Sequence, residues 1–122
     1  MIPKPTVMIV DDEAIIRNVS YAVLSRKYNV ILAPDVAQAK REVNAQTIDA
    51  IITDQIMSGE LGTDLIRYLN QKYPTIPVSL MSGNTFGADL TELTIYKVLE
   101  KPVSNQILRE TVAKMIVKSE DQ

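Results

Sequence analysis

Apolar positions along the chain follow two spacings, one typical of buried strands and one typical of amphipathic helices. Residues 6–10 read Thr-Val-Met-Ile-Val, an apolar and partly β-branched run that ends at an acidic pair. The residues after this pair carry apolar side chains at helical spacing, and the same order of strand and helix recurs down the chain. Strands are predicted at residues 6–10, 29–33, 49–53, 77–81 and 95–100.

Helices are predicted after each strand. The second begins at Pro34-Asp35 with Asp35 as its N-cap, the third spans residues 62–72, and the last runs from the N-cap Ser104 to about Lys118. Their apolar stripes are, in chain order, Ile15, Ile16, Val19 and Val23; Val36, Ala39 and Val43; Leu65, Ile66 and Leu69; and Ile107, Leu108, Val112, Met115 and Ile116. The helical pattern is weak over residues 84–94, so we expect a short fourth helix there.

This alternation predicts an α/β fold with parallel strands joined by right-handed crossovers. We expect a doubly wound five-stranded parallel sheet flanked by five helices. The chain has 122 residues, the usual size of one domain, so we expect a single domain over residues 1–122 with its core at about 6–117. In such sheets ligands bind beyond the carboxyl ends of the strands.

Composition excludes several classes of function. The chain has no Cys and no His, which removes thiolate nucleophiles, cysteine metal sites and the usual general base. Thirteen basic residues against fifteen acidic ones give a net charge of −2, so we expect no direct binding to nucleic acid. Apolar runs do not exceed four residues and the first residues lack a signal segment, so we expect no membrane association and a cytoplasmic location.

Polar and charged residues follow four of the predicted strands. They are Asp11 and Asp12 after the first strand, Asp54 after the third, Ser82 and Gly83 after the fourth, and Lys101 after the fifth. Two carboxylates about 5 Å apart repel by roughly 3 kcal/mol at an effective dielectric near 20, so three together imply a bound cation. An all-oxygen ligand set selects Mg²⁺ or Mn²⁺ over zinc.

A metal-bound carboxylate beside a lysine and a hydroxyl suits phosphoryl transfer, and one carboxylate can be the nucleophile. The amides of the glycine-containing loops after the third and fourth strands can help to hold an oxyanion. The Lys101-Pro102 bond can be cis, as only bonds before proline readily are. Taken singly, Asp11 and Asp12 can cap a helix and Ser82 can belong to a turn, but their combination on one edge favours a functional site.

The sequence resembles the receiver domain of two-component response regulators over about residues 6–117. The residues that carry the resemblance are the acidic pair, Asp54, Met57 three residues later, Gly62 eight residues later, Ser82, and Lys101-Pro102. The resemblance implies a flavodoxin-like, CheY-like fold with strand order 2-1-3-4-5. It also implies a role in signal transduction, in which a phosphoprotein switches a protein-interaction surface.

The same resemblance implies a role for each residue. Asp54 would accept a phosphoryl group from a histidine kinase or phosphotransfer protein. Mg²⁺ would be held by Asp12 directly, by Asp11 mostly through water, and by the main-chain carbonyl of Ile56. Ser82 and Lys101 would bind the phosphoryl oxygens, together with the amide of Gly83. The output would pass to a downstream protein or a fused effector domain, with a homodimer possible, and the domain would catalyse only its own phosphorylation and dephosphorylation.

Two positions depart from the family pattern. Ser58 stands where proline commonly follows the methionine, and a more mobile loop is expected there. Val98 stands where an aromatic switch residue is usual, while Tyr96 lies two residues earlier on the same strand face. Ser82, Val98 and Tyr96 are therefore the candidate switch residues.

Three other kinds of protein share part of this pattern. A pseudo-receiver would use the same fold as a phosphorylation-independent protein-binding module. A phosphatase of the haloacid dehalogenase type would carry an Asp-x-Asp pattern after the first strand, whereas the carboxylates here are adjacent. A flavodoxin-like FMN binder would need a glycine- and hydroxyl-rich loop where this chain has Asp11-Asp12-Glu13, which would repel a phosphate.

Overall fold

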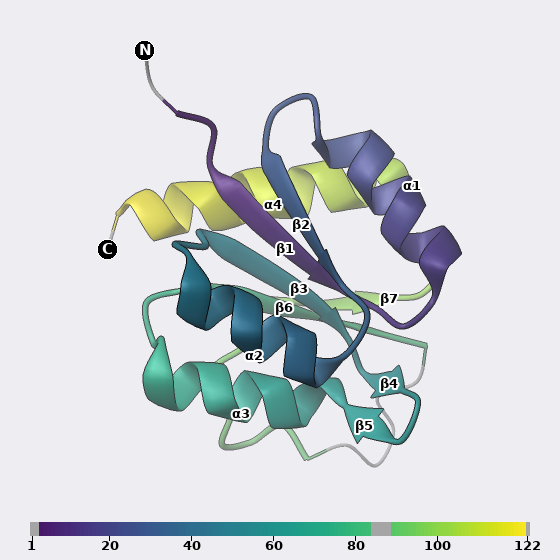
Figure 1. The fold of residues 1–122 in the computed structure, drawn as a ribbon, viewed down its shortest axis with the longest axis vertical. Helices are drawn as coiled ribbons and strands as arrows, with labels where there is room; N and C mark the ends of the chain where they lie inside the picture. The colour runs from purple at the N-terminus through teal and green to yellow at the C-terminus, as the bar shows by residue number, and fades with distance from the viewer. Residues whose placement is uncertain (1–2, 84–88, 122) are drawn as a thin grey trace.

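Five strands form one parallel sheet in the order β2-β1-β3-β6-β7 (Figure 1). The computed structural model describes residues 3–83 and 89–121. The elements are β1 (Thr6–Val10), α1 (Ala14–Leu24), β2 (Asn29–Ala33), α2 (Val36–Ala45), β3 (Ala50–Asp54), β4 (Ile56–Met57), β5 (Glu60–Leu61), α3 (Gly62–Lys72), β6 (Val78–Ser82), β7 (Val98–Glu100) and α4 (Asn105–Glu120). The predicted fold class and strand order are confirmed, with β6 and β7 as the fourth and fifth strands of the sheet.

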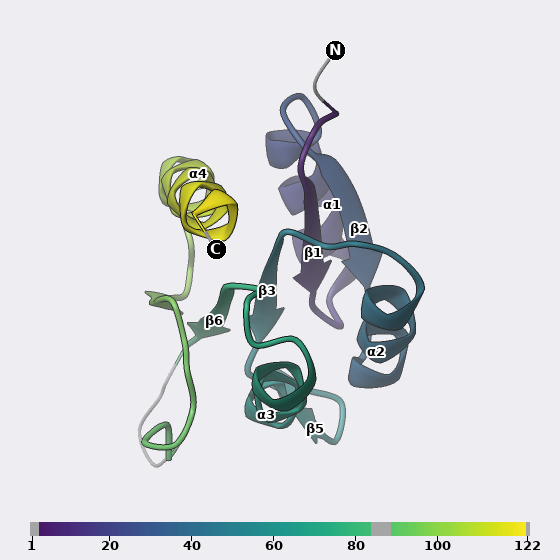
Figure 2. The same cartoon turned by 90° about the vertical axis from the view of Figure 1, so that its left-hand side faces the viewer.

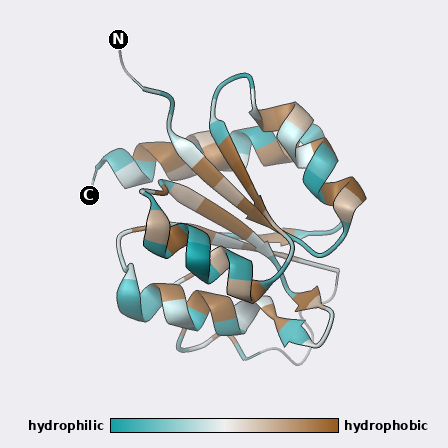
Figure 3. Ribbon diagram, in the orientation of Figure 1, coloured by the Kyte–Doolittle hydropathy of each residue, from teal (hydrophilic) through white to brown (hydrophobic). Residues whose placement is uncertain are grey.

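The sheet lies between two layers of helices, α1 and α4 on one face and α2 and α3 on the other (Figure 2). Successive side chains of a strand point to opposite faces, so each inner strand contributes to two cores. Met8 and Val10 pack with α2 and α3, whereas Val7 and Ile9 pack with α1 and α4. Figure 3 shows these strands as almost continuously hydrophobic, as expected for a sheet covered on both faces.

Strand register brings the chemistry-bearing residues to one edge of the sheet. Val10 pairs with Thr53, Asp54 with Met81, and Ser82 with Glu100. Because all of these strands are parallel, their carboxyl ends meet on the side where β4 and β5 lie (Figure 1). The residues that follow β1, β3, β6 and β7 therefore share one rim.

Most of the predicted helix features are confirmed. The Asp35 side chain accepts a hydrogen bond from the Gln38 amide at 2.7 Å, and the Ser104 hydroxyl accepts one from the Ile107 amide at 3.1 Å, so both are N-caps. The stripes of α2 and α3 are buried as predicted. The stripe of α1 is wrong in part, because Ser20 and Leu24 take the buried positions and Ile15 is 74% exposed. Val19 and Ile107 are also exposed.

The short fourth helix predicted over residues 84–94 is absent from residues 89–94, the part of that range that the structure describes. Residues 84–88 lie outside the described part of the chain, and residues 89–94 form turns and irregular backbone. The Asp89 side chain accepts a hydrogen bond from the Thr91 amide at 3.1 Å, a local bond that competes with helix formation. The Thr94 amide donates instead to the Asn70 side chain of α3 at 2.8 Å. The described residues therefore contain four helices rather than five.

Two further differences concern strands. The fifth strand of the sheet is shorter than the predicted residues 95–100, although the Tyr96 amide still donates to the Val78 carbonyl at 2.7 Å. The sequence reasoning did not predict β4 and β5, which form an antiparallel hairpin after Asp54. Its turn contains Gly59 at φ +77°, a conformation that favours glycine. None of the helices in the described ranges is both long and apolar enough to span a membrane.

Candidate functional site

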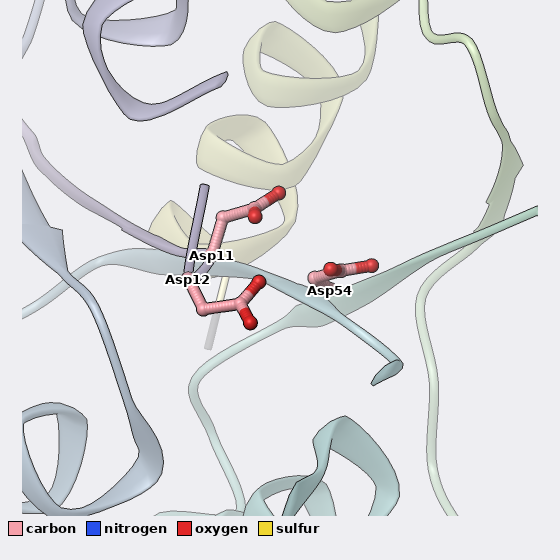
Figure 4. Close-up of side chains that lie close together, drawn as sticks. All are labelled: Asp11, Asp12 and Asp54. Atoms are coloured by element: carbon pink, nitrogen blue, oxygen red, sulfur yellow. The ribbon is translucent and has the colours of Figure 1, made fainter. Parts of the chain in front are cut away.

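Three carboxylates meet at the carboxyl rim of the sheet. Asp11 and Asp12 follow β1, and Asp54 is the last residue of β3 (Figure 4). One oxygen from each of the three lies within 4.8 Å of the others. The prediction that these residues converge is confirmed, because the parallel pairing of β1 with β3 places the two strand ends side by side.

Asp11 is completely buried. Its Oδ1 accepts a hydrogen bond from the Glu13 amide at 2.9 Å, while its Oδ2 has no hydrogen-bond partner among the described residues. Burial raises the pKa of this carboxyl above its ordinary value, and the nearby charge of Asp54 adds to the effect, against the lowering by the Glu13 amide. A buried carboxylate oxygen without a donor is suited to a hard cation, so the three aspartates fit a magnesium ion.

Asp12 is held by a residue from a distant segment. Its Oδ2 accepts hydrogen bonds from both the amide and the hydroxyl of Ser58, each at 3.0 Å. These two bonds, the amide first, lower the pKa of the Asp12 carboxyl, which is therefore ionised at neutral pH. Sequence reasoning noted Ser58 only as a departure from the family pattern.

Asp54 is almost fully buried and lies against a lysine. Its Oδ1 accepts a hydrogen bond from its neighbour's amide, that of Gln55, at 2.9 Å, and lies 2.9 Å from the Nζ of Lys101. The same Nζ is 4.0 Å from Oδ2 of Asp11. Burial by itself lowers the pKa of Lys101, but the hydrogen bond and charge of Asp54 and the charge of Asp11 outweigh it and raise the pKa above its ordinary value. The ammonium thus remains charged between the carboxylates.

The remaining predicted site residues lie around this group. Ser82 ends β6 and is buried, and its carbonyl accepts a hydrogen bond from the Lys101 amide at 3.0 Å. Gly83 follows it and is exposed, with no atom within 4 Å of a Cβ built there. The Lys101-Pro102 bond is cis, as the sequence allowed. Ile56 lies two residues beyond Asp54 with its side chain 71% exposed.

The candidate switch residues differ in their surroundings. Val98 lies on β7 opposite Leu80 and is exposed. Tyr96 precedes β7, is partly buried and packs against the core shared by the sheet, α1 and α4. Ser82 ends β6 and so lies at the site, whereas Val98 begins β7 and Tyr96 precedes that strand.

Two further residues shape the segment around Asp54. Sequence reasoning did not single out Gln55, and it noted Gly62 only as a loop glycine and as part of the family resemblance. The buried Gln55 side chain accepts a hydrogen bond from the Thr63 amide at 2.9 Å and thereby satisfies a donor at the start of α3. A Cβ built on Gly62 would lie 2.1 Å from the Asp54 carbonyl oxygen, so only glycine fits there. The signal for Gln55 was available, since an amide directly after a fully buried strand needs a partner.

Comparison with known proteins agrees with this geometry. The family model described as the response regulator receiver domain matches residues 7–113. The DNA-binding transcriptional regulator NtrC of Bradyrhizobium sp. (strain RP501 Parasponia) is 31% identical over 98% of this chain and 26% of its own length. The response regulator protein PilR of Pseudomonas aeruginosa is 32% identical over 87% of this chain and 25% of its own. The chain spans about a quarter of the length of these curated relatives.

Solved structures show the same fold. The signal receiver domain of an HD domain-containing protein from Pseudomonas fluorescens Pf-5 matches with a TM-score of 0.90 at 22% identity, covering 98% of this chain and 99% of that one. A response regulator receiver protein from Pseudomonas putida matches with a TM-score of 0.83 at 30% identity, covering 93% and 99%. With its acidic rim, its lysine contact and a family match over most of its length, the chain belongs to the response regulator receiver domain family.

Proposed function

We propose that Asp54 is the phosphoacceptor of this receiver domain and that it takes its phosphoryl group from a phosphohistidine on a histidine kinase or phosphotransfer protein. The observation that carries the proposal is the placement of the Asp54 carboxylate. It lies between two further carboxylates and the Lys101 ammonium, at the rim where α/β sheets bind ligands. This combination of a nucleophilic oxygen, a fixed cation and a metal-ligating set suits phosphoryl transfer.

The transfer replaces one bond to phosphorus by another. An Asp54 carboxylate oxygen attacks the phosphorus, the P–N bond to the imidazole breaks as the O–P bond forms, and the electron pair returns to the ring nitrogen. Lys101 neutralises charge on the phosphoryl oxygens, and the Ser82 hydroxyl and Gly83 amide donate hydrogen bonds to them. The same groups would bind the phosphoryl oxygens when water later hydrolyses the aspartyl phosphate.

Magnesium fits the site through a defined set of ligands. The three aspartates and the main-chain carbonyl of Ile56 would hold it, with Asp11 acting mostly through water. When bound, the ion neutralises the carboxylates and the phosphoryl oxygens, with Mn²⁺ as a possible substitute. Oδ2 of Asp11 supports this assignment, because within the described residues it accepts no hydrogen bond, and the single Lys101 ammonium, 4.0 Å away, is shared with Asp54.

Phosphorylation would act as a switch. An aspartyl phosphate adds negative charge beside β3 and β6 and biases the loops that follow them, with Ser82, Val98 and Tyr96 as the switch residues. The result is a changed surface for a downstream protein or for an effector domain fused to this one, or for a second copy of the chain. The curated relatives support the fused arrangement, since they are about four times as long as the segment they share with this chain.

Intact mass spectrometry tests the proposal. The protein is incubated with phosphoramidate, whose P–N bond matches that of phosphohistidine, with and without Mg²⁺. We expect one phosphoryl group on the wild type and on Asp64→Ala, which removes an exposed carboxylate from α3, and none on Asp54→Ala or with EDTA. Absence of an adduct together with absence of Mg²⁺ binding would favour the pseudo-receiver instead.

A further inference from the structure

Ser58 places two hydrogen-bond donors on one oxygen of Asp12. Its amide and its hydroxyl each lie 3.0 Å from Oδ2, across 46 positions of sequence. Oδ1 of Asp12 receives no bond from Ser58 and is left for other partners. We infer that Ser58 is a positioning residue for the magnesium site, holding the Asp12 carboxylate so that its second oxygen serves the cation. The inference rests on the magnesium site proposed above.

The hairpin that carries Ser58 is itself held in place. Met57 pairs with Glu60 across β4 and β5, which makes Ser58 and Gly59 the turn. Met57 is buried in the core beneath α2 and α3, and Glu60 accepts a hydrogen bond from the Val36 amide at the start of α2, at 3.3 Å. Ser58 is exposed, so packing of its own side chain does not dictate its position. The donors reach Asp12 because the hairpin presents them.

The two hydrogen bonds from Ser58 fix the orientation of the Asp12 carboxylate before a metal ion binds. An ionised carboxylate can accept about four hydrogen bonds through its two oxygens. Without Ser58, the half-buried side chain of Asp12 would rotate in the metal-free protein. Binding a metal ion would then cost the conformational entropy of that side chain. With Ser58, the freedom is already lost before binding. Partners of this kind commonly change metal affinity by about 10- to 100-fold when they are removed.

The two donors can be separated by substitution. Ser58→Ala removes the hydroxyl and keeps the amide. Ser58→Pro removes both, because proline has no backbone N–H. Ser58→Thr keeps both donors and is the matched control. The three variants therefore form a series in which the number of bonds to Asp12 falls from two to one to none.

Titration calorimetry of the unphosphorylated protein with MgCl₂ tests the inference. We expect Ser58→Thr to bind within about twofold of the wild type, Ser58→Ala to bind several-fold more weakly, and Ser58→Pro to bind about 10- to 100-fold more weakly. Circular dichroism checks the fold of each variant. If proline disrupts the hairpin, the comparison of alanine with threonine decides, because neither constrains the backbone of the turn as proline does.

The outcomes separate this inference from the function on which it rests. If the wild type binds no Mg²⁺, the proposed magnesium site is wrong and the role of Ser58 falls with it. If the wild type binds Mg²⁺ and Ser58→Ala binds equally tightly, Ser58 has no positioning role, although the site stands. Tighter binding by Ser58→Ala would also overturn the inference, because it would show that Ser58 competes with the ion for Asp12.

Discussion

The Nζ of Lys101 lies 2.9 Å from Oδ1 of Asp54, although Asp54 ends β3 and Lys101 follows β7, which is not a neighbour of β3 in the sheet. β6 lies between them, so the contact spans two strand spacings, or about 10 Å. The long lysine side chain crosses the end of β6 to reach Asp54. It also comes within 4.0 Å of Asp11 and thereby serves two buried carboxylates.

Replacing Lys101 tests this double role. Lys101→Met keeps much of the side-chain length but leaves the buried carboxylates without their cation, so we expect a loss of about 2 kcal/mol in the free energy of unfolding in EDTA. Urea denaturation measures it. Lys97→Met, which removes an exposed lysine from the same segment, should change stability by less than about 0.5 kcal/mol. Equal stability of Lys101→Met and wild type in EDTA would show that the ion pair contributes nothing net.

Gly62 is expected to be intolerant of any side chain. In Gly62→Ala the new Cβ would overlap the carbonyl oxygen of Asp54. This oxygen belongs to the main chain and cannot move aside as the end of a flexible side chain can. We expect a loss of about 3 kcal/mol or more by urea denaturation and weaker Mg²⁺ binding, because Asp54 must move. Gly83→Ala is the matched control, since its Cβ meets open space. A Gly62→Ala protein as stable as Gly83→Ala would contradict the packing described here.

Asp11 is expected to destabilise the metal-free protein. Its pKa is raised in the fold by burial, so ionisation is harder there than in the unfolded chain, and stability falls as the pH rises through the folded pKa. Asp11→Asn removes the charge at nearly constant shape. We expect its melting temperature in EDTA to rise by several degrees, and the stabilisation by Mg²⁺ to be lost. The exposed Asp64→Asn should show neither effect, and a lower melting temperature for Asp11→Asn would refute the argument.

Gln55 is expected to contribute to stability through α3. In Gln55→Leu the Thr63 amide loses its acceptor in a buried setting, which should cost about 2 kcal/mol. Hydrogen exchange of the first turn of α3, followed by NMR, should accelerate. Gln106→Leu, which removes an exposed glutamine whose amide bonds Glu110 on α4, serves as the control and should cost little. Unchanged exchange at Thr63 in Gln55→Leu would show that water replaces the lost acceptor.

Much of the fold was predictable because it depends on local pattern. Residues 6–10 and 29–33 became strands, and Asp35 and Ser104 became N-caps, where the sequence indicated. The stripe of α1 was less predictable, because helical spacing identifies apolar positions but not which of them meet the sheet. Ile15 is helical and apolar, yet it points away from the core.

The candidate site was likewise predictable only in part. The pattern of strands and helices was enough to predict one shared rim, because parallel strands joined by crossovers end on the same side. The residues on this rim are Asp11, Asp12, Asp54, Ser82 and Lys101. The three-dimensional fold was needed to show that Asp11 Oδ2 accepts no hydrogen bond from the described residues, that Ser58 bonds Asp12, and that the Gln55 side chain accepts the Thr63 amide. These contacts depend on the path of a hairpin and on side-chain directions across as many as 46 residues, which no local periodicity encodes.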